Sequence, residues 1–208
     1  MTRLPIASEG WPFILPAFAL VLFCALLHWR AAAAVALVLA LFVTWFFRDP
    51  ARAIPADPET LVSPADGRVI EIVPGAGGVT QISIFLSIFN VHVNRSPVAG
   101  EVVDVTRRPG KFLAAWKHEA SSDNAQASVT VRTPRGDVRF VQITGLIARR
   151  IVCHLAPGSI VARGERYGLI RFGSRMDIFL PPAAEPTVRV GDSVRGGTDV
   201  IARWKSER

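Results

Sequence analysis

The sequence predicts a mainly β domain, built as a β-sandwich or a partly open barrel, that follows an N-terminal helical membrane hairpin. Two changes of pattern lead to this fold class. Before residue 48 the chain holds two long apolar runs, and from Leu61 onward it holds short apolar runs broken by Gly, Pro and Asp. Long runs without a polar face are typical of membrane helices, whereas short, closely spaced runs are typical of strands. We therefore expect a membrane-anchoring hairpin in residues 1–50 and a β-domain in residues 51–208.

The two N-terminal runs, Trp11 to Leu27 and Ala31 to Phe47, are separated only by His28, Trp29 and Arg30. Each run spans about 25 Å as a helix at ~1.5 Å per residue, which is short for a bilayer crossing but sufficient. A cleaved signal peptide is disfavoured because a second apolar run follows at once, and a soluble hairpin because neither run has a polar face. Two full crossings and a re-entrant hairpin both remain open.

The charges that flank the hairpin predict its orientation. Both arrangements leave the outer ends of the hairpin on one side of the membrane, where Arg3, Arg48 and Arg52 lie, against Arg30 in the turn. The positive-inside rule then places the β-domain on the cytoplasmic face of the cell (inner) membrane. The net charge of +7 is consistent with attraction to an anionic lipid surface. The arginines are scattered and show no nucleic-acid-binding pattern, so we expect no nucleic acid partner.

Short apolar runs predict the strands of the β-domain, and their close spacing favours antiparallel pairing. Two stretches, Val161 to Gly168 and Val188 to Gly197, each have the pattern of a strand, a tight turn and a second strand. Such hammerhead turns recur in lipoyl-like β-sandwiches, although no carrier lysine occupies a hairpin tip here. The expected strands are Val69–Val73, Val79–Phe85, Gly100–Val105, Ser128–Val131, Val138–Thr144, Arg150–His154, Leu169–Phe172, Ile178–Leu180 and Thr187–Val190.

The segment Lys111–Ala120 has apolar residues at helical spacing and predicts a short helix. One interpretation is a helix packed on the sheet. The other is a membrane-facing segment in which Phe112 and Trp116 contact the bilayer interface and guide the substrate in. We expect His118, in the same segment, to be exposed.

The two cysteines, Cys24 and Cys153, lie in apolar stretches, so we expect them to be buried and unpaired. No Cys or His spacing typical of a metal site occurs in the sequence, and we expect no metal.

Four stretches carry residue types that suit chemistry. In one of them, Gly173-Ser174 lies between two strand-like runs. A glycine leaves its carbonyl unshielded and a serine supplies a hydroxyl nucleophile, so this bond is suited to self-cleavage; a plain glycine kink is the alternative. The four stretches are Ser63-Pro64-Ala65-Asp66-Gly67-Arg68-Val69, Phe85 to Gly100, Gly145 to Cys153, and Arg171 to Pro181.

In this order and spacing, the four stretches resemble the short form of the phosphatidylserine decarboxylase family, and the resemblance spans nearly all of residues 45–205. It implies that the proenzyme cuts itself between Gly173 and Ser174 into a larger chain, 1–173, and a small chain, 174–208. An ester forms first, and elimination leaves a pyruvoyl group, the covalent cofactor, in place of Ser174. This group forms a Schiff base with the amine of phosphatidylserine and accepts electrons as CO2 leaves, which gives phosphatidylethanolamine.

The resemblance also implies roles for individual residues. Asp66 belongs to the self-cleavage machinery, and His92 acts as general base and acid. Long-form relatives carry a second histidine three positions further on, where this chain has Arg95, so one imidazole serves both reactions or shares them with Arg95 and water. Arg149 and Arg150 are candidate phosphate donors. At most one of them faces a given pocket, because neighbouring strand residues point to opposite faces.

The partners that the resemblance implies are phosphatidylserine in the bilayer, the chain's own small fragment and a second copy in a homodimer. Two other functions stay open. One is decarboxylation of another serine-headed lipid of the archaetidylserine type, and the other is a membrane-anchored β-sandwich adaptor that needs no cut. A lysostaphin-like zinc peptidase is disfavoured because the sequence around His92 lacks the paired His-x-His of such sites.

Overall fold

The computed structural model describes residues 5–146, 150–171 and 174–206 of the chain. The chain forms two compact units, residues 1–51 and residues 52–208, which we take one at a time.

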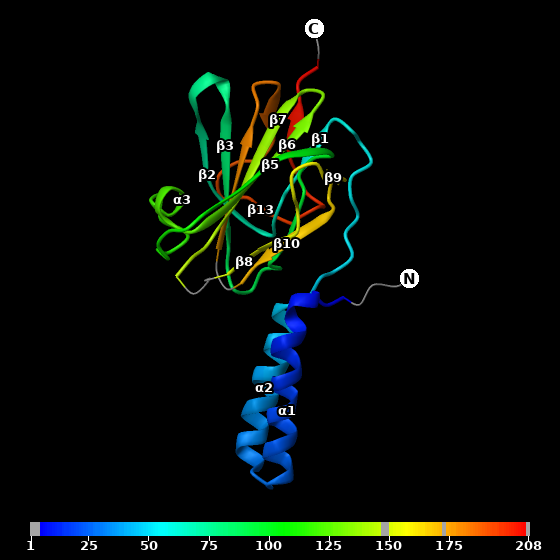
Figure 1. The fold of residues 1–208 in the computed structure, drawn as a ribbon, viewed down its shortest axis with the longest axis vertical. Helices are drawn as coiled ribbons and strands as arrows, with labels where there is room; N and C mark the ends of the chain where they lie inside the picture. The colour runs from blue at the N-terminus through cyan, green and yellow to red at the C-terminus, as the bar shows by residue number, and fades with distance from the viewer. Residues whose placement is uncertain (1–4, 147–149, 172–173, 207–208) are drawn as a thin grey trace. The chain divides into compact units, whose positions relative to one another are not determined.

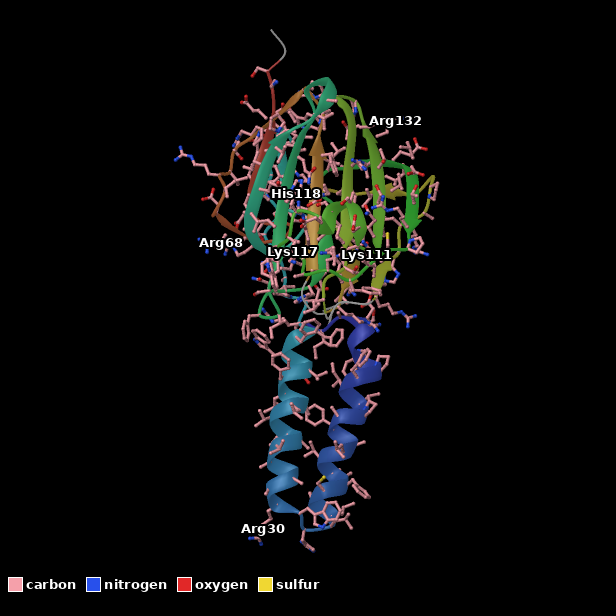
Figure 2. All side chains as sticks on the ribbon, turned by 90° about the vertical axis from the view of Figure 1, so that its left-hand side faces the viewer. Arg30, Arg68, Lys111, Lys117, His118 and Arg132 are labelled. Atoms are coloured by element: carbon pink, nitrogen blue, oxygen red, sulfur yellow. The ribbon has the colours of Figure 1, made fainter. Side chains whose placement is uncertain are left out.

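The first unit is a pair of helices, α1 (Trp11–Leu26) and α2 (Arg30–Phe46), preceded by the short 3-10 helix η1 (Ser8–Gly10). Both apolar runs are therefore helical, as predicted. Apart from Ile14, Cys24, Ala36, Ala40 and Phe46, the side chains of the two helices are exposed or half-buried, and Figure 2 shows them to be almost entirely carbon. The continuous helical stretch Ser8–Leu26 is long and apolar enough to cross a membrane, and α2 is slightly shorter.

The second unit is built on an open, curled sheet of eight antiparallel strands (Figure 1). The order across this large sheet is β13-β2-β3-β11-β7-β6-β5-β9. Strand β11 lies in the middle of the order, between β3 and β7, and it is buried along almost its whole length. The bounds are β2 (Gly67–Pro74), β3 (Thr80–Leu86), β5 (Gly100–Arg108), β6 (Gln126–Thr133), β7 (Gly136–Ile143), β9 (Ile160–Val161), β11 (Ser174–Leu180) and β13 (Ser193–Val194), with the 3-10 turn η2 (Ala76–Gly78) between β2 and β3.

Two three-stranded sheets complete the domain, in the orders β4-β10-β8 and β1-β14-β12. Apolar side chains from all three sheets form one core, which includes Val69, Ile84, Phe140, Tyr167 and Ile201. The small-sheet strands are β1 (Thr60–Val62), β4 (Val93–Arg95), β8 (Ile151–Cys153), β10 (Arg166–Ile170), β12 (Ala184–Pro186) and β14 (Val200–Trp204). The mainly β fold class is thus confirmed, and both cysteines are free and buried as expected.

Two local predictions are wrong. Residues 187–190 are not a strand, because pairing with β14 ends at Pro186. Lys111–Ala120 is not a helix either: the only helical turn there, α3, spans Ala120–Asp123. The segment before it is held in an irregular conformation by Asn124, whose side chain binds both the backbone N–H and the carbonyl of Leu113. His118 is exposed, as predicted.

Candidate active site

The large sheet brings several sequence-predicted residues to one of its ends. Strand β11 begins at Ser174, which is paired with Leu86, the last residue of β3. On its other side, Arg175 is paired with Ile143, the last residue of β7. The neighbouring β2 begins at Gly67, where a Cβ atom would lie only 2.3 Å from the Phe85 carbonyl oxygen. Glycine is therefore required directly after Asp66 for β2 and β3 to meet at this end.

Ser174 is fully buried at the start of β11. Its hydroxyl oxygen has no hydrogen-bond partner among the residues that the structure describes. A buried hydroxyl without a partner is costly, and such groups in native proteins call for a functional explanation. Gly173, the other half of the predicted cleavage site, lies outside the described residues.

His92 is also fully buried, and its orientation defines its chemistry. The ring Nδ1 lies 3.0 Å from the backbone carbonyl oxygen of Asn90. A carbonyl can only accept, so Nδ1 carries the proton, and Nε2 is the basic nitrogen of the neutral ring. Asn90 is itself fixed by its side-chain oxygen, which accepts hydrogen bonds from the Ser87 backbone N–H at 2.9 Å and the Ser87 hydroxyl at 2.8 Å.

His92 directly precedes β4 and continues its pairing with β10. The Ile170 N–H donates to the His92 carbonyl at 3.3 Å, and the pairs that follow are Val93 with Leu169 and Asn94 with Gly168. Asn94 contacts Gln142 of β7 across the two sheets, at 2.9 Å. Residues two apart on an extended segment share a face, so we expect His92 to share the face of Asn94, as Ser174 shares the face of Met176, the residue paired with Gln142. A meeting of the His92 and Ser174 side chains stays a prediction.

Asp66 is held away from these two residues. Its carboxylate accepts from Arg52 Nη2 at 2.8 Å and from the Gly196 backbone N–H at 2.8 Å. None of the contacts of Asp66 within the described residues reaches His92 or Ser174. The partner that orients the imidazole here is the Asn90 carbonyl, and the catalytic role of Asp66 stays a prediction.

A cavity of about 570 Å³ opens beside this end of the sheet. Its wall includes Asp66, Ser87 and Asn90, so it reaches the two residues that fix His92. Two guanidinium groups, those of Arg68 and Arg195, also line it and could bind a phosphate. The sequence analysis did not single out these two arginines, because Arg68 opens a strand and Arg195 lies in a loop, and an isolated arginine at either place is commonly a solvated charge.

The three arginines that the sequence analysis did select are placed differently. Arg95 donates from Nη1 to the Gly164 carbonyl at 3.1 Å. Arg150 is exposed, and its carbonyl accepts from the Arg171 N–H at 3.3 Å, which brings it to the segment leading into Ser174. Arg149 lies outside the described residues. A substrate-binding role for each of the three stays a prediction.

The opposite face of β11 carries a buried ion-pair network. Arg175 binds Asp177 at 2.7 Å and Glu71 at 2.7 Å, and both Arg175 and Asp177 are almost completely buried. Asp177 also accepts from Ser121 at 2.6 Å, while His118 contacts Glu71 at 2.8 Å. The segment that carries His118 and Ser121 also carries Lys111 and Lys117 (Figure 2). The network therefore fixes the outward-facing side of β11, beginning at Arg175, the residue after Ser174.

Two buried polar residues beside the site, Asn94 and Gln142, were missed by the sequence analysis. The available signal was their place in strand patterns. Each interrupts a mostly apolar run that continues on both faces of its strand: Asn94 follows Val91 and Val93, and Gln142 lies within Phe140–Ile143. A polar residue at a core position of a strand marks either a satisfied network or a site.

Comparisons with known proteins show the family of the chain. The family model described as phosphatidylserine decarboxylase matches residues 39–202. A phosphatidylserine decarboxylase proenzyme of Geotalea uraniireducens (strain Rf4) is 46% identical over 203 residues, which cover 95% of each chain. One of Pelobacter propionicus (strain DSM 2379 / NBRC 103807 / OttBd1) is 44% identical over 212 residues, which cover 96% of each chain. With the matches running from α2 to β14 and along nearly the whole of both relatives, the chain belongs to the phosphatidylserine decarboxylase family.

Proposed function

We propose that this chain is made as a proenzyme, cuts itself before Ser174, and then decarboxylates phosphatidylserine to phosphatidylethanolamine. The observation that carries the proposal is the buried, unpartnered hydroxyl of Ser174 at the start of β11, in a chain of this family. The surroundings fit conversion of this serine to a pyruvoyl group, because the hydroxyl has no competing partner within the described residues and the buried His92 is bonded through its backbone to Ile170, four residues before Ser174.

Self-cleavage requires a base, an attack and an elimination. His92 Nε2 takes the proton of the Ser174 hydroxyl, whose oxygen attacks the Gly173 carbonyl carbon and forms an ester as the peptide C–N bond breaks. The proton passes to the released nitrogen. Removal of the Ser174 α-proton then expels the carboxylate of Gly173. Water replaces the nitrogen, which leaves as ammonia, and a ketone remains at the start of the small chain.

In the decarboxylation, the residues of this chain bind, orient and move protons. The pyruvoyl group supplies a carbonyl that bonds to the amine of the lipid and withdraws electrons as CO2 leaves. His92 delivers the proton that the reacting carbon then needs. Arg68 and Arg195 bind the phosphodiester in the cavity that adjoins Asn90. Burial of the site excludes water, which would otherwise compete for the carbonyl.

The register explains how the two fragments stay together. Strand β11, in the fragment 174–208, is paired along its length with β3 and β7 of the larger chain. Strand β14 is paired with β1, and β13 is paired with β2. The cut therefore leaves an intact set of interchain hydrogen bonds and a shared core, and the mature protein is a complex of both fragments. The homodimer implied by the resemblance stays a prediction.

The helical hairpin keeps the enzyme with its substrate, because a lipid with two acyl chains stays in the bilayer. The hairpin inserts into the inner membrane, with the β-domain on the cytoplasmic face. Arg48 and Arg52 follow α2, whereas Arg30 is the arginine of the turn, labelled in Figure 2, and this difference supports the orientation.

Replacing Ser174 tests the proposal most directly. We expect Ser174→Ala to give a single chain of 22.6 kDa without decarboxylase activity, whereas the natural chain gives two fragments. Ser128→Ala, a half-buried serine of β6, is the matched control and should cleave normally. The intact mass of the small fragment should show a ketone in place of the serine amine and hydroxyl, and its N-terminus should be blocked to Edman degradation. Two fragments from Ser174→Ala, or an active uncut protein, would contradict the proposal.

A further inference from the structure

Asn94 and Gln142 form a fully buried polar pair, and Gln142 is paired with Met176, two residues along β11 from the proposed reactive residue. Gln142 Nε2 donates to Asn94 Oδ1 at 2.9 Å and to the Val152 carbonyl at 3.2 Å. Asn94 Nδ2 and Gln142 Oε1 have no hydrogen-bond partner among the residues that the structure describes. The pair thus offers one unused donor and one unused acceptor inside the protein.

The orientation of both amides is fixed by their neighbours. Flipping the Gln142 amide would place its oxygen against the Val152 carbonyl oxygen, and the two acceptors would repel each other. Because Gln142 Nε2 is the donor, the Asn94 atom that faces it must be the acceptor Oδ1. The Nδ2 of Asn94 therefore points away from Gln142. The unused donor therefore belongs to Asn94 and the unused acceptor to Gln142.

The pair differs from a buried asparagine with a purely structural role. Asn124 is also fully buried, yet its side-chain oxygen accepts from the Leu113 N–H, and its nitrogen donates to the carbonyls of Leu113 and Thr144. An unpaired buried donor such as Asn94 Nδ2 destabilises a fold, and an apolar residue of the same shape would avoid that cost. A ligand that supplies the missing acceptor and donor accounts for both atoms at once.

The position of the pair shows which ligand could reach it. Gln142 is opposite Met176 in the register, and Ser174 lies two residues before Met176 on the same face of β11. Diagonal neighbours of this kind are about 7–8 Å apart, within reach of long side chains. Gly168 keeps the space between the sheets open for the amide, since a Cβ there would lie 3.1 Å from Gln142 Nε2.

We propose that Asn94 and Gln142 bind the serine head group of the lipid, an inference that rests on the function proposed above. Asn94 Nδ2 donates to the carboxylate that will leave, and Gln142 Oε1 accepts from the amine. Once CO2 has left, Asn94 Nδ2 has no acceptor again, so the pair favours the substrate over the product and promotes product release.

Covalent trapping of the lipid on the small chain measures this preference without relying on turnover. The purified, cleaved full-length protein is incubated in detergent micelles that contain either phosphatidylserine or phosphatidylethanolamine at equal mole fraction. Cyanoborohydride reduces the linkage between the lipid amine and the protein carbonyl to a stable secondary amine, and the intact mass of the small chain counts the adduct. A lost hydrogen bond to a charged group changes affinity by about 10- to 100-fold, so the natural protein should trap phosphatidylserine preferentially by that factor.

Asn94→Leu should remove the preference while leaving self-cleavage in place, because leucine fills the same space without a polar atom. Trapping of the two lipids should become nearly equal, and the KM for phosphatidylserine should rise more than kcat falls. Gln126→Leu is the matched control: it replaces an amide on the outer face of the same sheet, where it binds the carbonyls of Ser121 and Asn124. This control should retain the preference.

Each outcome decides between the two proposals. An unchanged preference in Asn94→Leu would overturn the inference and leave the proposed function standing. Absence of trapping by the natural protein with either lipid would overturn the proposed function itself. If Asn94→Leu is not cleaved, Asn94→Ser, which shortens the side chain but keeps it polar, is measured in the same way. Failure of both variants to cleave would show that the pair builds the fold, and the inference would be wrong.

Discussion

The self-cleavage proposed for this chain would use two buried side chains that have opposite hydrogen-bonding states. Ser174 Oγ has no partner within the described residues, whereas the His92 ring is fixed by the Asn90 carbonyl. A free hydroxyl needs no bond to be broken before it attacks, and a fixed tautomer presents its basic nitrogen without rearrangement. The arrangement favours reaction over stability at this point of the fold.

Removing the imidazole should slow self-cleavage without unfolding the domain. We expect His92→Gln to lower the rate of fragment formation by about 100-fold or more, because general base catalysis contributes factors of that size. A time course after expression, followed on a gel, measures this rate. His154→Gln is the control. His154 is exposed and directly follows β8, so this variant should be cleaved at the rate of the natural chain. Equal rates for His92→Gln and the natural chain would show that another group is the base.

Residue types and their order point to only part of the candidate site. Gly173-Ser174 between two strand patterns suggests a self-cleaving bond, whereas His92 is selected by its place in the family resemblance, since a lone histidine among valines is usually structural. The Asn90 carbonyl that binds the imidazole could not be predicted, because a backbone atom leaves no trace in residue identity. The contacts of Asp66 with Arg52 and Gly196 were not predicted either, and its catalytic role stays a prediction.

Strand β11 has two different faces, and each does a separate task. Ser174 and Met176 face the core and the small β4-β10-β8 sheet, whereas Arg175 and Asp177 face outward into the ion-pair network. Burial alone would raise the pKa of Glu71, but the hydrogen bond and charge of Arg175, with a smaller contribution from His118, hold the pKa below its ordinary value. Glu71 therefore stabilises the folded state in its charged form.

This lowered pKa predicts how stability depends on pH. The contribution of Glu71 is fully present above its unfolded value of about 4.5 and is lost as the pH falls through the lower folded value. Glu71→Gln should therefore unfold at a lower temperature than the natural chain at neutral pH. Below about pH 4.5 the two midpoints should converge, because the natural glutamate becomes neutral as well. Thermal unfolding in detergent at several pH values measures the difference, and a gap that does not change with pH would disprove this role.

At the level of elements, the sequence predicted most long strands well but only the last three residues, Ile178–Leu180, of the central strand β11. Strands β2, β3, β5, β6 and β7 follow clear alternating patterns, and each was expected close to its observed bounds. Strands β1 and β14 pair across most of the chain, so neither short run identifies its partner locally. The 111–119 segment has helical spacing but is held by the long-range contacts of Asn124, and tertiary contacts here override local pattern.

On the scale of the whole molecule, the two units have opposite surface chemistry. The helical hairpin exposes leucine, phenylalanine and valine along both helices, whereas the β-domain encloses a single core. Exposed apolar surface of that extent calls for a bilayer or another apolar partner. The sequence already contained this division, because the change from long to short apolar runs is visible without any structure. The sequence alone does not predict which distant strands pair to form the curled sheet.

The hairpin predicts how the intact chain behaves on extraction. We expect the full-length protein to remain in the membrane pellet in high salt and to dissolve only in detergent, because apolar contacts with lipid are not screened by ions. Sedimentation followed by immunoblotting of both fragments measures this. The small fragment should follow the larger one into detergent, since β11 is paired on both sides. Intact protein in the high-salt supernatant would contradict a membrane anchor.

The central position of β11 also affects how long a cleaved protein would stay intact. Once a chain is severed before Ser174, its middle strand belongs to a separate short peptide, and thermal opening of the sheet would let that peptide diffuse away into the cell. Reassembly would then become a meeting of two molecules at low concentration, and each such opening would be final. If the chain is cut as proposed, the working lifetime of the enzyme would be set by how slowly the sheet opens, and opened molecules would be replaced only by new synthesis.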